Sequence, residues 1–194
     1  MNFAVVPAAG RSSRLGRAKA LVPFGTSVVI DALIETLKQG GVNRVIVIAA
    51  PGDDRLLEHC TDSGFLSAVN PRVADGMLSS IQCGLRRLSK ELDTDATVTI
   101  CPVDFPALRS TTVAALLSAF QTSPLRLTVP RFAGRRGHPL TLTTELARKV
   151  HGLDPARGLR ALLDSEPHQV IDVDDPGIHH DLDTWLDYLE LTGC

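Results

Sequence analysis

Aromatic side chains are scarce in this sequence and make up 4% of its 194 residues. So few rings leave few platforms on which a nucleobase could stack, and the residues that would select a base cannot be located from the sequence. Excess charge of either sign is also missing, since the net charge is −2 at pH 7. A chain without a large positive charge lacks the general attraction to nucleic acid, so we expect a small-molecule partner.

Paired cysteines and long apolar runs are absent too. The sequence has four cysteines, Cys60, Cys83, Cys101 and Cys194. They lie far apart and form no C-x-x-C motif, so their spacing suggests neither a zinc site nor a disulfide framework. The first residues do not resemble a signal peptide, and no segment is long enough to cross a membrane. We therefore expect a protein of the reducing cytoplasm with no membrane partner.

Short β-rich apolar runs alternate with amphipathic segments along the chain. This pattern is typical of β-α-β units, in which helices cover both faces of a mainly parallel sheet. Predicted strands span residues 2–6, 44–49, 66–70, 96–101, 125–130 and 168–173. Predicted helices span residues 27–39, 53–60, 77–90, 110–121, 143–150, 157–164 and 183–191. With 44% hydrophobic residues, the chain can bury one substantial core, so we expect a three-layer α/β fold in a single domain, residues 1–194.

The segment after the first predicted strand is small, flexible and cationic. Gly10 and Gly16 allow backbone conformations that other residues resist, and small side chains let main-chain N–H groups approach phosphate oxygens. Four cations lie within nine residues, namely Arg11, Arg14, Arg17 and Lys19. Single Lys and Arg side chains are usually solvated surface groups, but a place in a glycine loop after a strand favours phosphate binding. We therefore predict a cradle for a nucleoside triphosphate.

Two familiar glycine-loop templates do not fit this segment. A Walker loop requires Lys and then Ser or Thr directly after its second Gly, whereas Arg17 and Ala18 follow Gly16. A dinucleotide fingerprint requires three spaced glycines, and only Gly10 and Gly16 are present. The order Ala-Ala-Gly, Ser, Arg, Gly, Lys instead resembles the signature of the MobA-like NTP transferase family, which includes molybdenum cofactor guanylyl- and cytidylyltransferases.

The resemblance implies which residues of this loop bind the nucleotide. The residues with small side chains that would cradle the phosphates are Ala8, Ala9, Gly10, Ser12 and Ser13. Arg14 and Lys19 would also bind phosphate, and they would stabilise charge on the phosphates during transfer. We expect Arg11 and Arg17 to be surface groups.

A carboxylate follows the fourth predicted strand in the sequence Pro102-Val103-Asp104-Phe105-Pro106. Ligands of open parallel sheets bind at the carboxyl ends of strands, so Asp104 could hold Mg²⁺ against an α-phosphate, or it could simply form a turn. The family carries a metal-binding Asp in an Asp-x-Pro motif at this point, so the resemblance implies the ligand role. Val103 stands where the family usually has Gly, and it narrows the space beside the carboxylate.

Residues 70–81 resemble the Asn, Gly-Met and Ser-Ser segment of the cytidylyltransferase branch of the family. Asn70, Ser79 and Ser80 are the candidate nucleotide-binding residues here. Ser79 and Ser80 fall in the first turn of a predicted helix, where N–H groups and hydroxyls bind base or phosphate. Ordinary helix capping would explain part of this pattern.

Residues 134–139 resemble the Gly-x-x-Gly-His-Pro stretch of the same branch. Arg135 and Arg136 can reach an anionic acceptor, although a basic hairpin tip has the same composition. We expect His138 to bind substrate rather than to act as a base, because phosphoryl transfer depends mainly on positioning and electrostatics.

The last candidate segment, Asp181-Leu182-Asp183-Thr184, resembles the closing Asp-x-Asp-Thr of the family. We expect one carboxylate, Asp181, to bind a metal, and we expect the other, Asp183, or the neighbouring Thr184 to cap the final helix. The adjacent His179 and His180 have no second pair at metal spacing, so we expect them to be surface residues.

The matching segments span residues 5–184, which is nearly the whole chain. The resemblance implies that a phosphate of the molybdenum cofactor attacks the α-phosphorus of CTP and releases pyrophosphate. It also implies Mg²⁺ as the cofactor, held by Asp104 and Asp181, and a molybdoenzyme as the client of the product.

Two further functions stay open at this point. Relatives with the Pro-Ala-Ala-Gly opening transfer nucleotides to other phosphorylated acceptors, and GTP could replace CTP. A non-catalytic protein that binds nucleotide or cofactor and delivers it to a molybdoenzyme would be compatible with Val103. Pyrophosphate release that is lost in Asp104→Ala would exclude this delivery role.

Overall fold

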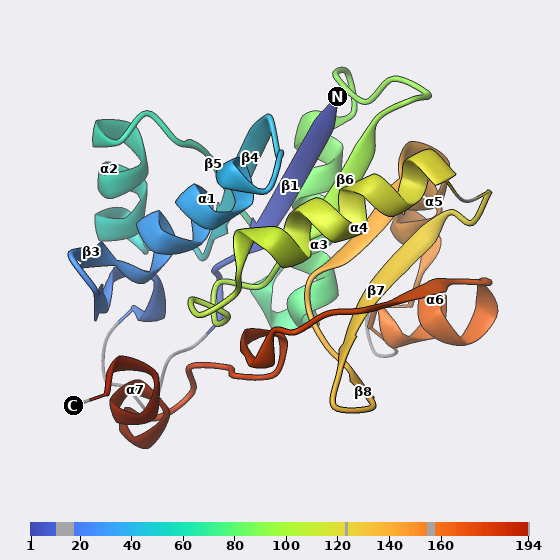
Figure 1. The fold of residues 1–194 in the computed structure, drawn as a ribbon. Coiled ribbons are helices and arrows are strands. Elements are labelled where there is room, and N and C mark those ends of the chain that lie inside the picture. The colour runs from blue at the N-terminus through green and yellow to red at the C-terminus, as the bar shows by residue number, and fades with distance from the viewer. Residues whose placement is uncertain (11–17, 123, 155–157, 194) are drawn as a thin grey trace.

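The computed structural model describes residues 1–10, 18–122, 124–154 and 158–193. An eight-stranded sheet runs through the centre with the strand order β10-β7-β9-β6-β1-β4-β5, and β8 pairs with β7 (Figure 1). Its strands are β1 Asn2–Pro7, β4 Arg44–Ala49, β5 Leu66–Val69, β6 Thr97–Ile100, β7 Leu127–Phe132, β8 Arg135–Arg136, β9 Leu140–Thr143 and β10 Gln169–Asp172. A separate hairpin joins β2 Pro23–Phe24 to β3 Ser27–Val28.

Most neighbouring strands are parallel, as the alternating pattern predicts. β1 pairs in parallel with β4 and β6, β4 with β5, and β10 with β7. The exceptions are β8, which is antiparallel to β7, and β9, which is antiparallel to both β6 and β7 and was not among the predicted strands. Leu140 and Leu142 of this strand pack into one core, while the hydroxyl of Thr141 contacts that of Thr99 at 3.1 Å. All six strands predicted from the sequence form.

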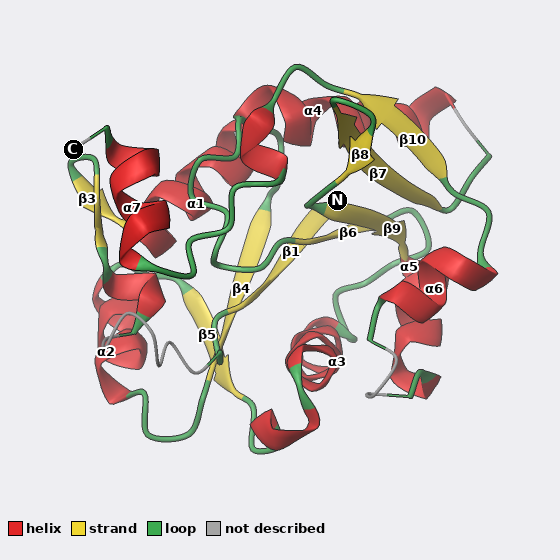
Figure 2. Cartoon of the chain, turned by 90° about the horizontal axis from the view of Figure 1, so that it is seen from below, coloured by secondary structure: helices red, strands yellow, loops and turns green. Residues whose placement is uncertain are grey.

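All seven predicted helices form as well. They are α1 Val29–Gln39, α2 Asp54–Asp62, α3 Met77–Leu88, α4 Ser110–Thr122, α5 Thr144–Lys149, α6 Arg160–Ser165 and α7 Trp185–Thr192. Helices α1 and α4 cover one face of the sheet, and α3, α5 and α6 cover the other (Figure 2). This arrangement confirms the predicted three-layer α/β fold. Among the described residues, no helix combines the length and the apolar character that a membrane span needs.

The central strand β1 supplies side chains to two hydrophobic cores because successive residues of a strand point to opposite faces. Ala4 and Val6 pack on the side of α1, whereas Phe3 and Val5 pack on the side of α3. A Cβ atom on Gly84 of α3 would lie 2.6 Å from Cγ1 of Val5, so glycine lets this helix lie close to β1. The close approach brings the N-terminal end of α3 to the carboxyl end of β1.

Candidate active site

A pocket of about 690 Å³ opens at the carboxyl ends of β1 and β6. Its walls come from residues 7–10 after β1, residues 102–104 after β6 and parts of residues 73–80 before and within α3, together with Lys19 and Asp183. A volume of several hundred Å³ is typical of small-molecule sites, and the carboxyl ends of parallel strands are where such folds bind ligands. The pocket therefore joins four of the segments that the sequence analysis singled out.

The loop after β1 lies against the segment that carries Asp104. The amide of Ala8 donates to the carbonyl oxygen of Ile48 at 2.8 Å, and the amide of Val103 donates to that of Pro7 at 3.1 Å. Ala8, Ala9 and Gly10 line the pocket, as a phosphate cradle requires. The predicted phosphate-binding residues Ser12, Ser13 and Arg14, like Arg11, Gly16 and Arg17, lie outside the described residues.

Asp104 is the most buried of the acidic groups in the pocket wall. Its side chain is 20% exposed, and its Oδ1 atom is buried with no hydrogen-bond partner among the described residues. Burial raises the pKa of this carboxyl, while the nearby ammonium of Lys19 lowers it and the charges of Asp183 and Asp181 raise it. A buried carboxylate oxygen without a donor is a ready ligand for a hard cation.

Lys19 links two carboxylates that lie far apart in the sequence. Its Nζ atom lies 2.6 Å from Oδ1 of Asp183 and 3.5 Å from Oδ2 of Asp104. All three residues line the pocket, so a cation and two anions share one wall. Lys19 was predicted to bind the phosphates, and its contact with Asp183 has no signal in the sequence.

The final helix is capped by Thr184 rather than by Asp183. The Thr184 hydroxyl accepts a hydrogen bond from the amide of Asp187, whose carboxylate accepts one from the amide of Thr184, which completes a capping box. Of the two capping candidates, Thr184 therefore caps the helix and Asp183 does not, and the Asp183 side chain is directed to Lys19 instead. Asp181, the expected metal ligand, is exposed and does not line the pocket, although its charge acts on both Asp104 and His138.

A fully buried carboxylate, Asp175, fastens the C-terminal segment to the start of α4. One oxygen accepts from the amide of Arg109 at 2.9 Å and from the hydroxyl of Thr112 at 2.6 Å, and the other accepts from the amide of Gly177 at 2.9 Å. A Cβ atom on Gly177 would lie 2.2 Å from the carbonyl oxygen of Ala107, so glycine is needed at this crossing. Asp175 was not among the predicted site residues, and its one signal in the sequence is a position before Pro176 that suits a capping residue.

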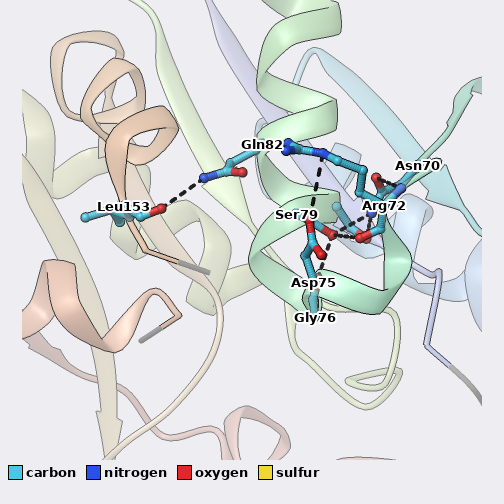
Figure 3. A network of polar contacts seen from close by, with 8 residues as sticks. Asn70, Arg72, Asp75, Gly76, Ser79, Gln82 and Leu153 are labelled. Carbon is cyan, nitrogen blue, oxygen red and sulfur yellow. Dashed lines mark hydrogen bonds and ion pairs between the residues drawn. The ribbon is translucent and has the colours of Figure 1, made fainter. Parts of the chain in front are cut away.

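Asn70 organises the pocket wall ahead of α3. Its amide nitrogen donates to the hydroxyls of Ser79 at 2.7 Å and Ser80 at 3.0 Å, and its carbonyl oxygen accepts from the amide of Arg72. The Ser79 hydroxyl bonds to the carbonyl oxygens of Arg72 and Gly76 (Figure 3). Asn70 and Ser79 are completely buried, whereas Ser80 lines the pocket. The structure thus brings the three predicted residues together, with Ser80 in front and the other two behind it.

The predicted acceptor hairpin lies beside the pocket and does not line it. Arg135 and Arg136 are exposed, and a guanidinium nitrogen of Arg136 lies 2.8 Å from the His168 ring. The His138 ring packs on Phe105 with 4.8 Å between ring centroids, which puts it next to the Asp104 segment. Burial lowers the pKa of His138 to about 4, so this side chain is neutral at neutral pH. Its buried Nδ1 atom has no hydrogen-bond partner in the described part of the chain.

Residues 1–10, 18–122, 124–154 and 158–193 contain no cluster of three or more His, Cys, Asp or Glu side chains arranged to hold a metal ion. The candidate metal ligands in the pocket are two carboxylates, Asp104 and Asp183. Mg²⁺ usually binds one or two carboxylates and completes its octahedron with water and substrate phosphates. Two carboxylates therefore suit Mg²⁺ that is brought to the site with a triphosphate, and they are too few to enclose a metal ion with protein ligands alone.

A family model described as the MobA-like NTP transferase domain matches residues 4–170. The chain belongs to the MobA-like NTP transferase family. Nicotine blue oxidoreductase of Paenarthrobacter nicotinovorans is 29% identical over 93% of this chain and 91% of its own. Molybdenum cofactor cytidylyltransferase of Escherichia coli (strain K12) is 21% identical over 95% of this chain and 92% of its own. Membership confirms the resemblance predicted from the loop after the first strand.

Solved structures support the same fold assignment. The crystal structure of Rv0371c from Mycobacterium tuberculosis H37Rv is 25% identical, covers 100% of this chain and 97% of its own, and superposes with a TM-score of 0.84. A second structure of Rv0371c, a complex with manganese, covers 99% of this chain and 98% of its own at 23% identity with a TM-score of 0.80. The MobA-like chain described here therefore has the Rossmann-like architecture of nucleotidyltransferases.

Proposed function

We propose that this MobA-like protein transfers CMP from CTP to the molybdenum cofactor and releases pyrophosphate, as a single domain spanning residues 1–194. The observation that carries the proposal is the meeting of Lys19, Asp104 and Asp183 on one wall of the pocket, beside the small-residue loop after β1. A cation for phosphate oxygens beside carboxylates for a divalent metal is what phosphoryl transfer from a metal-bound triphosphate requires. The likeness to the Escherichia coli cytidylyltransferase supports the choice of CTP and acceptor.

The chemistry consists mainly of positioning and charge neutralisation. A phosphate oxygen of the acceptor forms a bond to the α-phosphorus while the bond from that phosphorus to the bridging oxygen breaks, and pyrophosphate leaves with the bond electrons. The amides of residues 8–10 and the side chain of Lys19 hold the phosphates and offset the charge that develops on them. Asp104 and Asp183, with Asp181 nearby, would hold Mg²⁺, which supplies further neutralisation of the triphosphate when bound.

The acceptor enters from the side of the hairpin in this proposal. Arg135 and Arg136 offer exposed guanidinium groups to an anionic acceptor. Because the pKa of His138 is lowered to about 4, this residue would contribute a hydrogen bond rather than a positive charge at neutral pH. The aligned phosphates then need no general base for the transfer.

A second candidate function follows from nicotine blue oxidoreductase, which shares 29% identity with this chain. In that case the same pocket would serve the oxidation or reduction of a compound such as nicotine blue. The wall of Lys19 with two carboxylates favours nucleotide transfer, because nothing in a redox step requires a cation between two anions. The same wall would also suit transfer to another phosphorylated acceptor, transfer from GTP, or delivery of a bound nucleotide without catalysis.

The test is an incubation with CTP, GTP, ATP or UTP, Mg²⁺ and the molybdenum cofactor, with products identified by mass spectrometry. The proposal predicts a cytosine dinucleotide form of the cofactor from CTP. A guanine dinucleotide form would show that GTP rather than CTP is the nucleotide donor. Nucleotide binding without product would indicate another acceptor or a delivery role. Oxidation or reduction of nicotine blue without any nucleotide transfer would favour the second candidate.

A further inference from the structure

The ammonium group of Lys19 lies between the two carboxylates that are proposed to hold the metal. Its Nζ atom is 2.6 Å from Oδ1 of Asp183 and 3.5 Å from Oδ2 of Asp104. The Lys19 side chain is only 13% exposed, so it is held in the pocket wall rather than extended into solvent. A cation already stands where two anionic ligands converge.

Lys19 lies close to only one of the two carboxylate oxygens of Asp104. Its Oδ2 atom faces Lys19, whereas Oδ1 is buried with no hydrogen-bond partner among the described residues. Within the described part of the chain, a monovalent ammonium therefore leaves one buried carboxylate oxygen without a partner. A divalent ion could use that oxygen, but it would have to approach within a few ångströms of the Lys19 charge.

Resting on the proposed function, we infer that Lys19 holds the cation position between Asp104 and Asp183 until a triphosphate draws it away. Two positive charges a few ångströms apart repel each other strongly wherever solvent is partly excluded. The free protein consequently binds a divalent ion weakly. Phosphate oxygens provide Lys19 with new anionic partners, and its departure frees both carboxylates for the metal that accompanies the nucleotide.

The arrangement gives a physical reason for the metal and the nucleotide to enter together. Without nucleotide, Lys19 neutralises two carboxylates that would otherwise repel each other, the buried one of Asp104 and the half-exposed one of Asp183. With nucleotide, the same lysine neutralises phosphate, and the carboxylates turn to the metal. Lys19 therefore competes with the metal and assists the nucleotide, so one substitution should change the affinities for the two ligands in opposite directions.

The inference is tested by titrating the protein, residues 1–194, with Mn²⁺ in the absence of nucleotide and measuring free Mn²⁺ by electron paramagnetic resonance. Lys19→Met should bind Mn²⁺ at least about tenfold more tightly than the wild type, because the competing charge is gone. The charge-matched control is Lys149→Met, since Lys149 pairs with Glu166 on another part of the surface and is not a pocket residue. It should leave Mn²⁺ affinity within about twofold of the wild type, as expected for a screened surface pair. Lys19→Gln provides a second, polar replacement, and circular dichroism checks that each variant folds.

The affinity for CTP, measured by calorimetry with EDTA present, should change in the opposite direction from the affinity for Mn²⁺. Lys19→Met should weaken CTP binding at least about tenfold, and general damage to the pocket would not weaken one ligand while tightening the other. If the wild type and both Lys19 variants bind Mn²⁺ equally, the inference is overturned while the proposed metal site survives. If none of the proteins binds Mn²⁺ even with CTP, the metal part of the proposed function fails and the inference fails with it.

Discussion

The main-chain amide of Leu182 donates a hydrogen bond to the carbonyl oxygen of Asp104 at 2.8 Å. This single bond brings together two segments that are far apart in the sequence, and it lies directly beside Asp183. The second carboxylate of the site therefore owes its position to a tertiary contact of the C-terminal segment. Substitutions that weaken the packing of the C-terminal segment should therefore displace Asp183 and impair the site even when they remove no pocket residue.

Asp175 offers the sharpest test of how firmly the segment is held. Asp175→Ala should lower the free energy of unfolding by about 2–4 kcal/mol, because three donors that now bond to its buried carboxylate would lose their partner. Urea denaturation measures the change. The control is Asp172→Ala, which removes an exposed carboxylate paired with Arg131 and should have little effect. Equal effects of the two substitutions would refute the anchoring role.

Asp183 and Asp181 can be separated by their effects on metal affinity. Asp183→Asn should weaken Mn²⁺ binding in the presence of CTP about tenfold or more, because Asp183 lines the pocket and contacts Lys19. Asp181→Asn should weaken it only slightly, through the loss of a nearby charge. The reverse order would restore the assignment made from the sequence, in which Asp181 is the ligand.

The network around Asn70 should affect stability and binding together. Asn70→Ala should cost about 1–3 kcal/mol of unfolding free energy and should also raise the KM for CTP, because the network fixes the wall ahead of α3. Ser80→Ala removes a hydroxyl that lines the pocket and should raise KM with a smaller loss of stability. Thermal unfolding and initial rates measure both quantities. A stability loss for Asn70→Ala with unchanged KM would limit this network to a folding role.

The site should lose metal affinity on acidification at a higher pH than an ordinary aspartate would predict. Burial raises the pKa of Asp104, so its proton is bound more tightly in the folded protein than in the unfolded chain. Its ionisation therefore costs stability at neutral pH, and Asp104→Asn should not lower the unfolding free energy there. Mn²⁺ affinity falls as the pH drops through this raised pKa.

In Lys19→Met, the loss of Mn²⁺ affinity on acidification should begin at a higher pH than in the wild type. The reason is that the lysine charge lowers the pKa of Asp104. Mn²⁺ titrations at a series of pH values, carried out on the wild type and on Lys19→Met, measure the shift. If the pH at which Mn²⁺ affinity falls is unchanged or lower in Lys19→Met, the assigned environment of Asp104 is contradicted.

Local patterns carry much of the architecture and some of the site. The continuous apolar run of β1 and the amphipathic character of α1 and α3 are properties of short segments, so they can be recognised before any contact is known. The placement of Ala8, Ala9, Gly10 and Asp104 just after strand ends follows from the same reasoning, because parallel strands end at a common edge. The antiparallel β9, Leu140–Thr143, is as long as β5 and β6, which were predicted. It was missed because it lies between the stretch at 134–139 and the helix predicted over 143–150, which left few residues to assign.

The remaining features depend on contacts between distant segments. Asp183 sits two residues from Asp181 and next to a helix start, and only the docking of Leu182 on Asp104 decides which carboxylate faces Lys19. Asp175 looks like any acid before proline until its partners at the start of α4 are known. Asn70 and Ser79 were predicted from a motif, but the motif could not tell that they are buried behind Ser80.

The most direct measurement is pyrophosphate release from CTP in the presence of Mg²⁺ and the molybdenum cofactor, with Asp104→Asn as the paired variant. The account predicts release by the wild type, one pyrophosphate for each cofactor converted, and a loss of at least about a hundredfold in the variant, because the buried carboxylate would hold the divalent cation that offsets the negative charge on the phosphates. Release that is unchanged in Asp104→Asn, or a wild type that binds no nucleotide, would contradict the account.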